Sequence, residues 1–247
     1  MKKTRFWLGA ALGVPFLLLS TLAWAELKGQ FGLFFPGGKF MDLDVASEAD
    51  RVEKQAEIGF SLSFGDVDWP VMLAVDVMTS GSDDDFLADS YSFDYAGPYF
   101  NYTVTYNYFL DYDVDTTEVN LGVRKFWREE KRFAPYVGGG LAFVTLDATS
   151  KLLTEVDVEG IAVPGASASL ELVDDSDTAV GYWVNGGLQW RMWRGSGSLL
   201  LGVDVRYSDA EAELDTGQGG FNLTGVIDED EVDAGGLHAG ITFGYHW

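Results

Sequence analysis

Hydrophobic and polar residues alternate with a period of two in eight segments of this chain. The clearest segment is 55–64, where every second residue is apolar: Ala56, Ile58, Phe60, Leu62 and Phe64. Such alternation predicts a β-strand with one apolar and one polar face. The eight predicted strands are 27–35, 55–64, 69–78, a fourth that ends near 127, 133–144, 179–193, 198–207 and 237–247.

The last predicted strand sorts its side chains most sharply between two faces. One face carries Leu237, Ala239, Ile241, Phe243, Tyr245 and Trp247, and the other carries His238, Gly240, Thr242, Gly244 and His246. The first face requires apolar surroundings, whereas the second requires a wet or crowded interior. A transmembrane β-barrel provides both.

Short and long connections alternate between the predicted strands. Three are short, at 65–68, 128–132 and 194–197, and four are long, at 36–54, 79–116, 145–178 and 208–234. An even number of strands with short periplasmic turns and long outer loops is typical of bacterial outer-membrane barrels. The sequence therefore predicts an all-β fold, a transmembrane antiparallel up-and-down β-barrel of eight strands with long extracellular hairpins.

The long connection 79–116 contains a further alternating run, from Tyr102 to Val114. Its apolar residues have even numbers, whereas Val119, Leu121 and Val123 in the following strand have odd numbers. We expect a β-bulge or a bend at 115–117 to reconcile the two patterns. Two additional strands within the long connections are the alternative.

Tryptophan and charge mark the two ends of the predicted barrel. Basic residues gather near two of the short turns, and acidic residues crowd the long connections. Clustered tryptophans are typical of the aromatic girdle at a membrane interface. The predicted periplasmic girdle consists of Trp69, Trp127, Trp190, Trp193 and Trp247.

The N-terminal segment predicts export to the Gram-negative outer membrane. Three basic residues precede the apolar run 6–22, which Ala23-Trp24-Ala25 follows, so we expect a Sec signal peptide (1–25) that is cleaved, and a single barrel domain (26–247). The absence of cysteine excludes a lipoprotein and disulfide bonds. The formal net charge of −23 disfavours nucleic acid as a partner.

Several segments resemble the small eight-stranded outer-membrane barrels of the OmpA/OmpX type, across the whole expected mature chain. They are Val119-Asn120-Leu121-Gly122-Val123-Arg124, Ala134-Pro135-Tyr136-Val137-Gly138-Gly139-Gly140-Leu141 and the aromatic-ended last strand. The resemblance implies that Phe243, Tyr245 and Trp247 form the signal recognised by the outer-membrane assembly machinery. Because the chain ends at this strand, we expect no peptidoglycan-binding domain. Outer-membrane lipid and lipopolysaccharide are the expected surroundings.

The inward face of the predicted barrel carries charges that must be paired, because an uncompensated buried ion costs several kcal/mol. The predicted lumen charge network consists of Glu57, Asp76, Glu118, Arg124, Arg191, Asp204, Arg206 and His238, with Asn185 and Gln189 on the same face. An eight-stranded barrel is barely wide enough for its own side chains. We therefore expect a salt-bridged plug, with a narrow proton or ion path as the alternative.

The sequence predicts no catalytic site and no tightly bound metal. The only histidines, His238 and His246, have no neighbouring serine in a His-x-Ser pattern. The acidic loops lack EF-hand spacing and predict at most loosely bound Ca²⁺ or Mg²⁺, with Asp83, Asp84, Asp85, Asp228 and Asp230 as the candidates.

The expected function is structural or interactive. The barrel would stabilise the outer leaflet, or present acidic extracellular loops to a ligand that the sequence does not identify. The alternatives are a narrow, porin-like channel for ions or small hydrophobic solutes and, less favoured, an enzyme that modifies lipid A.

Overall fold

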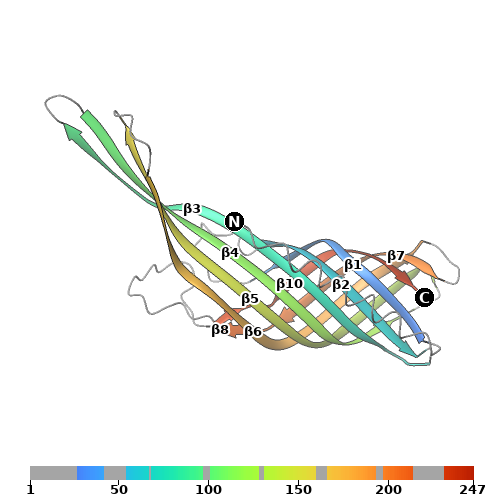
Figure 1. Cartoon of the computed structure of the whole chain (residues 1–247). Helices are drawn as coiled ribbons and strands as arrows, with labels where there is room; N and C mark the ends of the chain where they lie inside the picture. The colour runs from blue at the N-terminus through green and yellow to red at the C-terminus, as the bar shows by residue number, and fades with distance from the viewer. Residues whose placement is uncertain are drawn as a thin grey trace.

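Eight strands close into one antiparallel barrel, in the order β1-β10-β7-β6-β5-β4-β3-β2 (Figure 1). The computed structural model describes residues 27–41, 54–66, 68–96, 101–127, 131–159, 166–192, 197–213 and 231–247, so the predicted signal peptide lies outside it. The barrel strands are β1 (Leu27–Phe40), β2 (Lys54–Asp66), β3 (Met72–Ala96), β4 (Asn101–Phe126), β5 (Phe133–Glu159), β6 (Ala166–Arg191), β7 (Ser198–Asp209) and β10 (Gly236–His246). The predicted fold class and the predicted number of barrel strands are confirmed.

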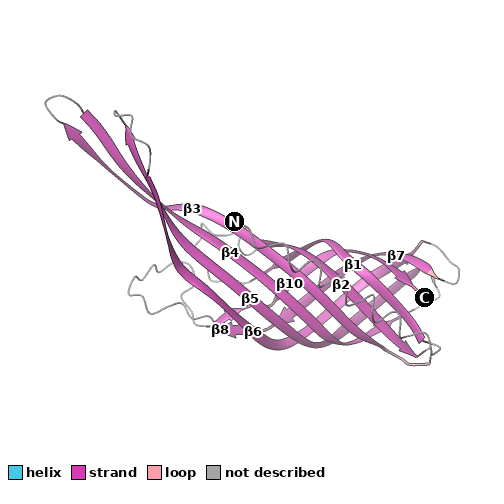
Figure 2. Cartoon of the chain, viewed as in Figure 1, coloured by secondary structure: helices cyan, strands magenta, loops and turns pink. Residues whose placement is uncertain are grey.

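Two short strands lie outside this ring. β8 (Glu211–Glu213) and β9 (Glu231–Asp233) pair with each other in antiparallel fashion, and β8 contacts β6. Every regular element in the described part of the chain is a strand (Figure 2). Within those residues, no helix has the length and apolar character needed to cross a membrane.

The alternation in the sequence produces an inside-out arrangement of side chains in the barrel. On β5, Leu141 is 56% exposed on the outer face, whereas the adjacent Ala142 is completely buried. On β7, Val203 and Val205 are exposed, but the charged Asp204 is buried in the lumen. A water-soluble domain buries its apolar side chains instead, so this exterior suits an apolar medium.

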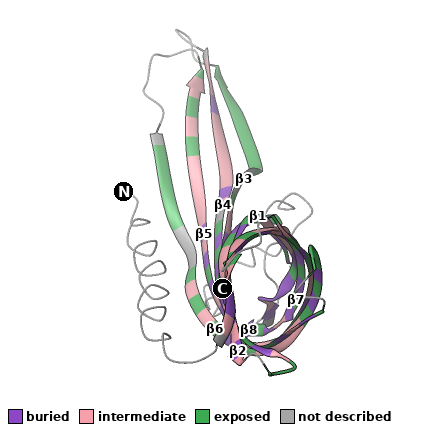
Figure 3. Ribbon diagram, turned by 90° about the vertical axis from the view of Figure 1, so that its right-hand side faces the viewer, coloured by how far each residue is buried: buried purple, intermediate pink, exposed green. Residues whose placement is uncertain are grey.

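Four strands continue far beyond the ring on one side of the barrel (Figures 1 and 3). We call this extension the blade; it consists of 83–96 of β3, 101–115 of β4, 147–159 of β5 and 166–176 of β6. Their order is β3-β4-β5-β6, and each pair continues the ladder of the barrel below. The predicted long connections 79–116 and 145–178 are therefore largely strand.

The β-bulge predicted at 115–117 is wrong. β4 pairs with β5 without a register shift from Thr103 to Phe126, so the backbone passes this point as a regular strand. Val114 and Glu118, on either side of it, are both buried on the inner face. The apolar residues move from the outer face to the inner face at this point because the surroundings of the sheet change. Successive side chains keep their regular alternation between the two faces.

A row of four threonines marks the level of this change. Thr79, Thr117, Thr145 and Thr178 lie directly opposite one another across β3, β4, β5 and β6. Below this threonine row the outer face carries exposed apolar side chains such as Val180. Above it the outer face carries Asp115 and Asp147. On β4 and β5 the exterior therefore changes from apolar to acidic within two residues of the threonine row.

A bulge in β1 changes which of its residues face the lumen. Pairing with both neighbouring strands shifts between Phe34 and Gly37. Beyond the shift Lys39 faces inward, and both Phe34 and Lys39 are buried. A side chain at Gly37 or Gly240 would collide with the Phe34 ring, which explains why glycine occupies both positions. The predicted first strand ended at Phe35 and missed this turn of the chain.

An apolar cluster, which we call the mouth cluster, occupies the barrel interior at the level of the threonine row and above it. Its members come from β5 and β6 and from the segment that contains β8 and β9, and they include Val144, Leu146, Ala148, Ala179, Ala210, Ala212, Val232 and Ala234. Each of these side chains is at most 6% exposed. The interior thus becomes apolar where the exterior becomes polar, as expected of a sheet that leaves lipid and enters water.

Candidate functional site

The structure brings most of the predicted lumen charge network together inside the barrel. Glu57, Asp76, Glu118, Arg124, Asp204, Arg206 and His238 are each at most 4% exposed, and Asn185 and Gln189 are buried on the same face. Arg191 is the exception, because it is only half-buried at the end of β6 that lies away from the blade.

Asp76 of β3 is the centre of the network. Its Oδ2 accepts hydrogen bonds from Arg124 Nη2 at 2.8 Å and from Arg206 Nη2 at 3.0 Å. Arg124 also donates from Nη1 to the hydroxyls of Ser61 and Ser63 on β2, at 2.8 and 3.0 Å. One carboxylate therefore ties β3 to β4 and, across the lumen, to β7.

Glu118, His238 and Glu57 form a second group nearer the blade. His238 of β10 lies between the two carboxylates, with Nδ1 at 2.7 Å from Glu57 Oε1 and Nε2 at 3.3 Å from Glu118 Oε2. Arg206 Nη1 lies 4.0 Å from Glu118 Oε1 and links this group to Asp76. A ring that carries protons on both nitrogens donates to both carboxylates.

Ser208 also contacts His238, although the two residues form no His-x-Ser pattern in the sequence. Ser208 Oγ lies 3.0 Å from His238 Nε2, and Glu57 is on the opposite ring nitrogen. This order of contacts matches a hydrolytic triad. However, Glu118 Oε2 accepts a hydrogen bond from the same hydroxyl at 3.0 Å and lies beside the same ring nitrogen. Ser208 is also completely buried, so no substrate reaches it.

Asp204 anchors the third group, on the side of Arg206 that faces away from the blade. Its Oδ2 accepts hydrogen bonds from Tyr136 OH at 2.5 Å and from Asn185 Nδ2 at 2.9 Å. The completely buried Trp183 ring lies 5.7 Å from the Arg124 guanidinium carbon and 5.6 Å from that of Arg206. Cation–π contacts of this kind strengthen when water is excluded.

Lys39 is the functional residue that sequence analysis missed. Its Nζ donates to Thr116 Oγ1 at 3.1 Å and to the carbonyl of Ala234 at 2.6 Å, so it holds the segment after β9 against the barrel wall. The signal for its direction was Pro36-Gly37-Gly38 in the middle of an alternating run, because proline and glycine within a strand often mark a bulge.

The charges in the lumen balance. Four carboxylates (Glu57, Asp76, Glu118 and Asp204) face the permanent cations Arg124 and Arg206, and Lys39 and His238 supply the third and fourth positive charges when both are protonated. Together the hydrogen bonds and ion pairs of these groups involve all eight barrel strands. This arrangement is a cross-brace, since every strand contributes at least one polar side chain.

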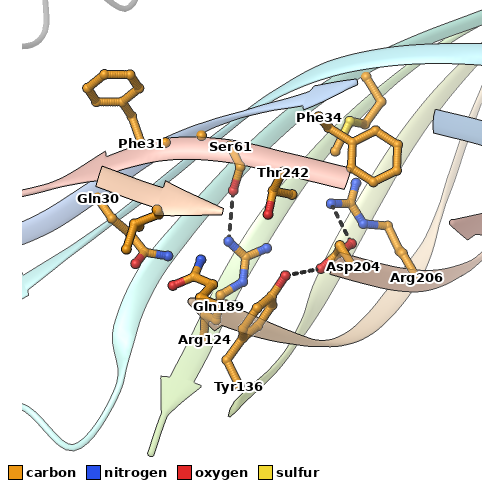
Figure 4. A pocket seen from close by; sticks show the side chains of 14 residues that line it. Gln30, Phe31, Phe34, Ser61, Arg124, Tyr136, Gln189, Asp204, Arg206 and Thr242 are labelled. Carbon is orange, nitrogen blue, oxygen red and sulfur yellow. Dashed lines mark hydrogen bonds and ion pairs between the residues drawn. The ribbon is translucent and has the colours of Figure 1, made fainter. Parts of the chain in front are cut away.

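The lumen contains a cavity of about 20 Å³ below the charge network (Figure 4). It is lined by side chains that include Gln30, Arg124, Tyr136, Gln189, Asp204 and Arg206. A cavity of this size holds about one water molecule. It is too small for an organic substrate or a hydrated ion.

The described members of the aromatic girdle lie at the end of the barrel that carries the short turns. Trp69, Trp127 and Trp190 are partly exposed there, and Trp247 exchanges two backbone hydrogen bonds with Gly29 on β1. Trp193 lies outside the described residues. Phe243 and Tyr245 of the predicted assembly signal face outward on β10, next to Leu33 and Phe31 of β1.

The two faces of the blade differ in chemistry. The inner face, which continues the lumen side of the barrel, carries stacked aromatic rings: Tyr95 and Tyr102 lie 4.9 Å apart, and Phe93 and Tyr106 lie 6.1 Å apart. The outer face is acidic near the barrel. Asp83 lies opposite Asp113, and Asp115 lies opposite Asp147.

The close approach of these carboxylates alters their acidity. Partial burial raises the pKa of Asp113 above its ordinary value of 3.8, and the neighbouring Asp83 raises it further. Burial likewise raises the pKa of Asp115, and Asp113 and Asp147 add to the effect. The ionised forms are therefore disfavoured in the folded blade, because like charges directly opposite each other on a sheet destabilise it.

Replacing Asp115 with asparagine should stabilise the blade at neutral pH, by about 1 kcal/mol or less. Since the pKa of Asp115 is raised on folding, its charge destabilises the folded state above that pKa, and the penalty disappears as the pH falls below 3.8. Thermal unfolding in micelles between about pH 3 and pH 8 measures the difference. Asp157→Asn is the control, because Asp157 is opposite Thr105 and has no facing carboxylate. A benefit from Asp115→Asn that persists in acid would contradict this explanation.

Among the described residues, no three acidic or histidine side chains converge as they would around a metal ion. Of the weak metal candidates, Asp83 lies opposite Asp113 of β4, and the side chains of Asp84 and Asp85 are outside the described ones. Asp228 and Asp230 lie outside the described residues.

Comparison with known proteins finds similarity among solved structures. No protein-family model matches the chain, and no curated protein matches it. Among solved structures, it is similar to Neisserial surface protein A (NspA), with 13% sequence identity and a TM-score of 0.39. The similarity covers 90% of this chain and 96% of that one. The class of the protein, an eight-stranded antiparallel barrel with a closed lumen, therefore rests on its own geometry.

Proposed function

We propose that this protein is a non-conducting outer-membrane β-barrel that holds the blade outside the cell as an interaction surface. The observation that carries the proposal is the double closure of the lumen. The balanced ion-pair network fills the barrel below the threonine row, and the mouth cluster fills it above. A barrel closed in this way acts as an anchor for what it displays.

The outer surface supports a location in a membrane. Large apolar side chains are exposed around the barrel on most of its strands, including Leu33, Ile58, Leu73, Leu121, Leu141, Val184, Val203 and Phe243. A continuous apolar band of this kind on a soluble monomer would promote aggregation. The band ends in tryptophans on one side and in the threonine row on the other, as membrane interfaces require.

The N-terminal segment and the resemblance to OmpA/OmpX-type barrels support the same location, with lipopolysaccharide around the base of the blade. In this setting Phe243, Tyr245 and Trp247 serve assembly, and the cross-braced barrel also stiffens the outer leaflet. The buried Ser208–His238–Glu57 contacts are out of reach of a lipid substrate. In this proposal they contribute to the cross-brace.

Purified protein in a planar bilayer should give no discrete conductance steps. The reason is that ions meet paired charges and then an apolar layer, and neither leaves a hydrated path. A general porin reconstituted in parallel verifies that fusion and detection work. Reproducible single-channel steps would overturn the closed-lumen proposal and favour the narrow-channel alternative.

A further inference from the structure

The extracellular part of β3 has one edge without a neighbouring strand. β3 pairs with β2 only from Leu73 to Gly81, but it continues to Ala96 with β4 as its partner. Across the described ranges, no strand pairs with the other edge between Asp83 and Ala96. Figure 1 shows this portion of β3 running along the margin of the blade. Unpaired N–H and C=O groups at such an edge are a template for another strand.

Burial on the inner face of the blade decreases toward this edge. Val104 on β4 is only 8% exposed because strands lie on both of its sides. On β3, Tyr91, Phe93 and Tyr95 belong to the same face and are 63%, 41% and 48% exposed. These rings lack a neighbour on the edge side. An added strand would cover them with its own apolar side chains.

The edge is acidic and carries neither lysine nor proline, and its pairing with β4 shifts register once, between Leu87 and Asp89. The segment 83–96 contains Asp83, Asp84, Asp85, Asp89 and Asp94, but no lysine, arginine or proline. Natural edge strands are commonly protected by lysine or proline. The aspartates disfavour pairing between two copies of this edge, because like charges would face each other across the new ladder. They favour a basic strand.

The outer face of the edge shows where positive charges would be placed. Asp83 and Asp94 lie on this face, and Asp83 is next to Asp113 on β4. The inner face beside them is aromatic. A complementary strand therefore alternates, with basic residues on the outer face and apolar residues on the inner face.

We propose that the edge of β3 from Asp83 to Ala96 binds an extended, cationic, amphipathic peptide segment of a partner, which joins the blade as its fifth strand. Main-chain hydrogen bonds hold the segment, Tyr91, Phe93 and Tyr95 contact its apolar side chains, and the aspartates select its basic ones. This inference depends on the proposed function, because the blade must lie outside the cell to meet such a partner.

Three synthetic peptides of about twelve residues test the chemistry of the partner on the full-length protein in detergent. One alternates lysine and valine, one alternates glutamate and valine, and one has the lysines and valines in separate blocks. The alternating basic peptide should bind about tenfold more tightly than the other two, and salt should weaken it because exposed charges are screened. Equal binding of the acidic or the block peptide overturns the proposal.

Hydrogen exchange locates the bound peptide. The alternating basic peptide should slow exchange of backbone amides in 83–96, while those in 166–176 of β6, at the other margin of the blade, remain unchanged. Protection at β6 in place of β3 overturns the assignment to this edge.

Substitutions on β3 separate the charge from the backbone contribution. Asp83→Asn with Asp94→Asn should weaken binding of the basic peptide by about three- to tenfold, as expected for two exposed ion pairs.

Ser90→Pro and Tyr91→Pro form a pair, because adjacent N–H groups point to opposite edges of a strand. The variant whose removed N–H faces β4 loses blade stability. The other stays folded and should lose peptide binding; full binding by that folded variant overturns strand addition.

Labelling of whole cells distinguishes this inference from the proposed function. If an impermeant reagent labels a cysteine introduced at Ser92, the blade is outside the cell, and absence of peptide binding then overturns the edge proposal alone. If the reagent does not label it while the protein is folded in the membrane, the proposed display function is overturned.

Discussion

Replacing Arg206 with methionine is expected to lower the free energy of unfolding by about 3–5 kcal/mol, the largest loss of any single change in the lumen. Arg206 lies 3.0 Å from Asp76, 3.8 Å from Asp204 and 4.0 Å from Glu118, and it is only 2% exposed. Its removal leaves three carboxylates with one fewer buried cation. Reversible urea unfolding in lipid vesicles, followed by tryptophan fluorescence, measures the change.

A second variant shows whether lost charge balance causes the effect. Arg206→Met combined with Glu118→Gln restores neutrality, so the double variant should be more stable than the sum of the two losses indicates, by about 0.5–3 kcal/mol. Arg132→Met, at an exposed position beside Trp190, is the matched control and should change stability by about 0.5 kcal/mol or less. A neutral Arg206→Met variant would show that the charge network does not brace the barrel.

The barrel and the direction of its side chains were predictable from the sequence because a strand alternates its faces without exception unless a bulge intervenes. Glu57, Asp76 and Arg206 were placed in the lumen from parity alone, and the structure buries all three. Lys39 escaped because the bulge between Phe34 and Gly37 shifts the parity of β1. The alternation reveals such a shift only when the proline and glycines at 36–38 are counted as part of the strand.

The contact between Ser208 and His238 was not predictable for a different reason. It depends on the register between β7 and β10, in which His238 lies opposite Arg206. These strands are separated by a long connection, and its length does not fix their register. A pattern within one strand gives the face of a residue, whereas its partner on another strand depends on the pairing of the whole sheet.

The inversion of apolar parity at 115–117 lies at the level where the outer face changes from apolar to acidic, which under the proposed function is where the protein leaves the membrane. β4 is regular there, so no β-bulge causes the inversion. Apolar side chains face outward below the threonine row and face the interior above it. The same inversion occurs on β5, where Phe133, Val137 and Leu141 are exposed below the row and Leu146 and Ala148 are buried above it. When the apolar alternation inverts at the same level on adjacent strands of such a barrel, the inversion therefore indicates an interface between two surroundings. A β-bulge is then not needed to explain it.

Replacing Leu121 with arginine is expected to lower the free energy of unfolding by about 2–4 kcal/mol. Replacing Asp115 with arginine, on the same strand and the same face, should leave the free energy of unfolding unchanged. Leu121 is 44% exposed, lies opposite Val75 and Leu141, and is midway between Trp127 and the threonine row. A guanidinium there would enter the hydrocarbon. Asp115 is two residues above the row, where an arginine would meet water and the carboxylates of Asp113 and Asp147.

Unfolding of both variants by urea in lipid vesicles measures the contrast, with folding verified by altered migration in unheated gels. In detergent micelles the difference should shrink, because a micelle adjusts its shape around a charged side chain more readily than a bilayer does. Equal losses for Leu121→Arg and Asp115→Arg in vesicles would show that the threonine row is not the membrane boundary. The lipid-facing surface would then extend onto the blade, and the acidic cluster at its base would have to lie at the level of the bilayer.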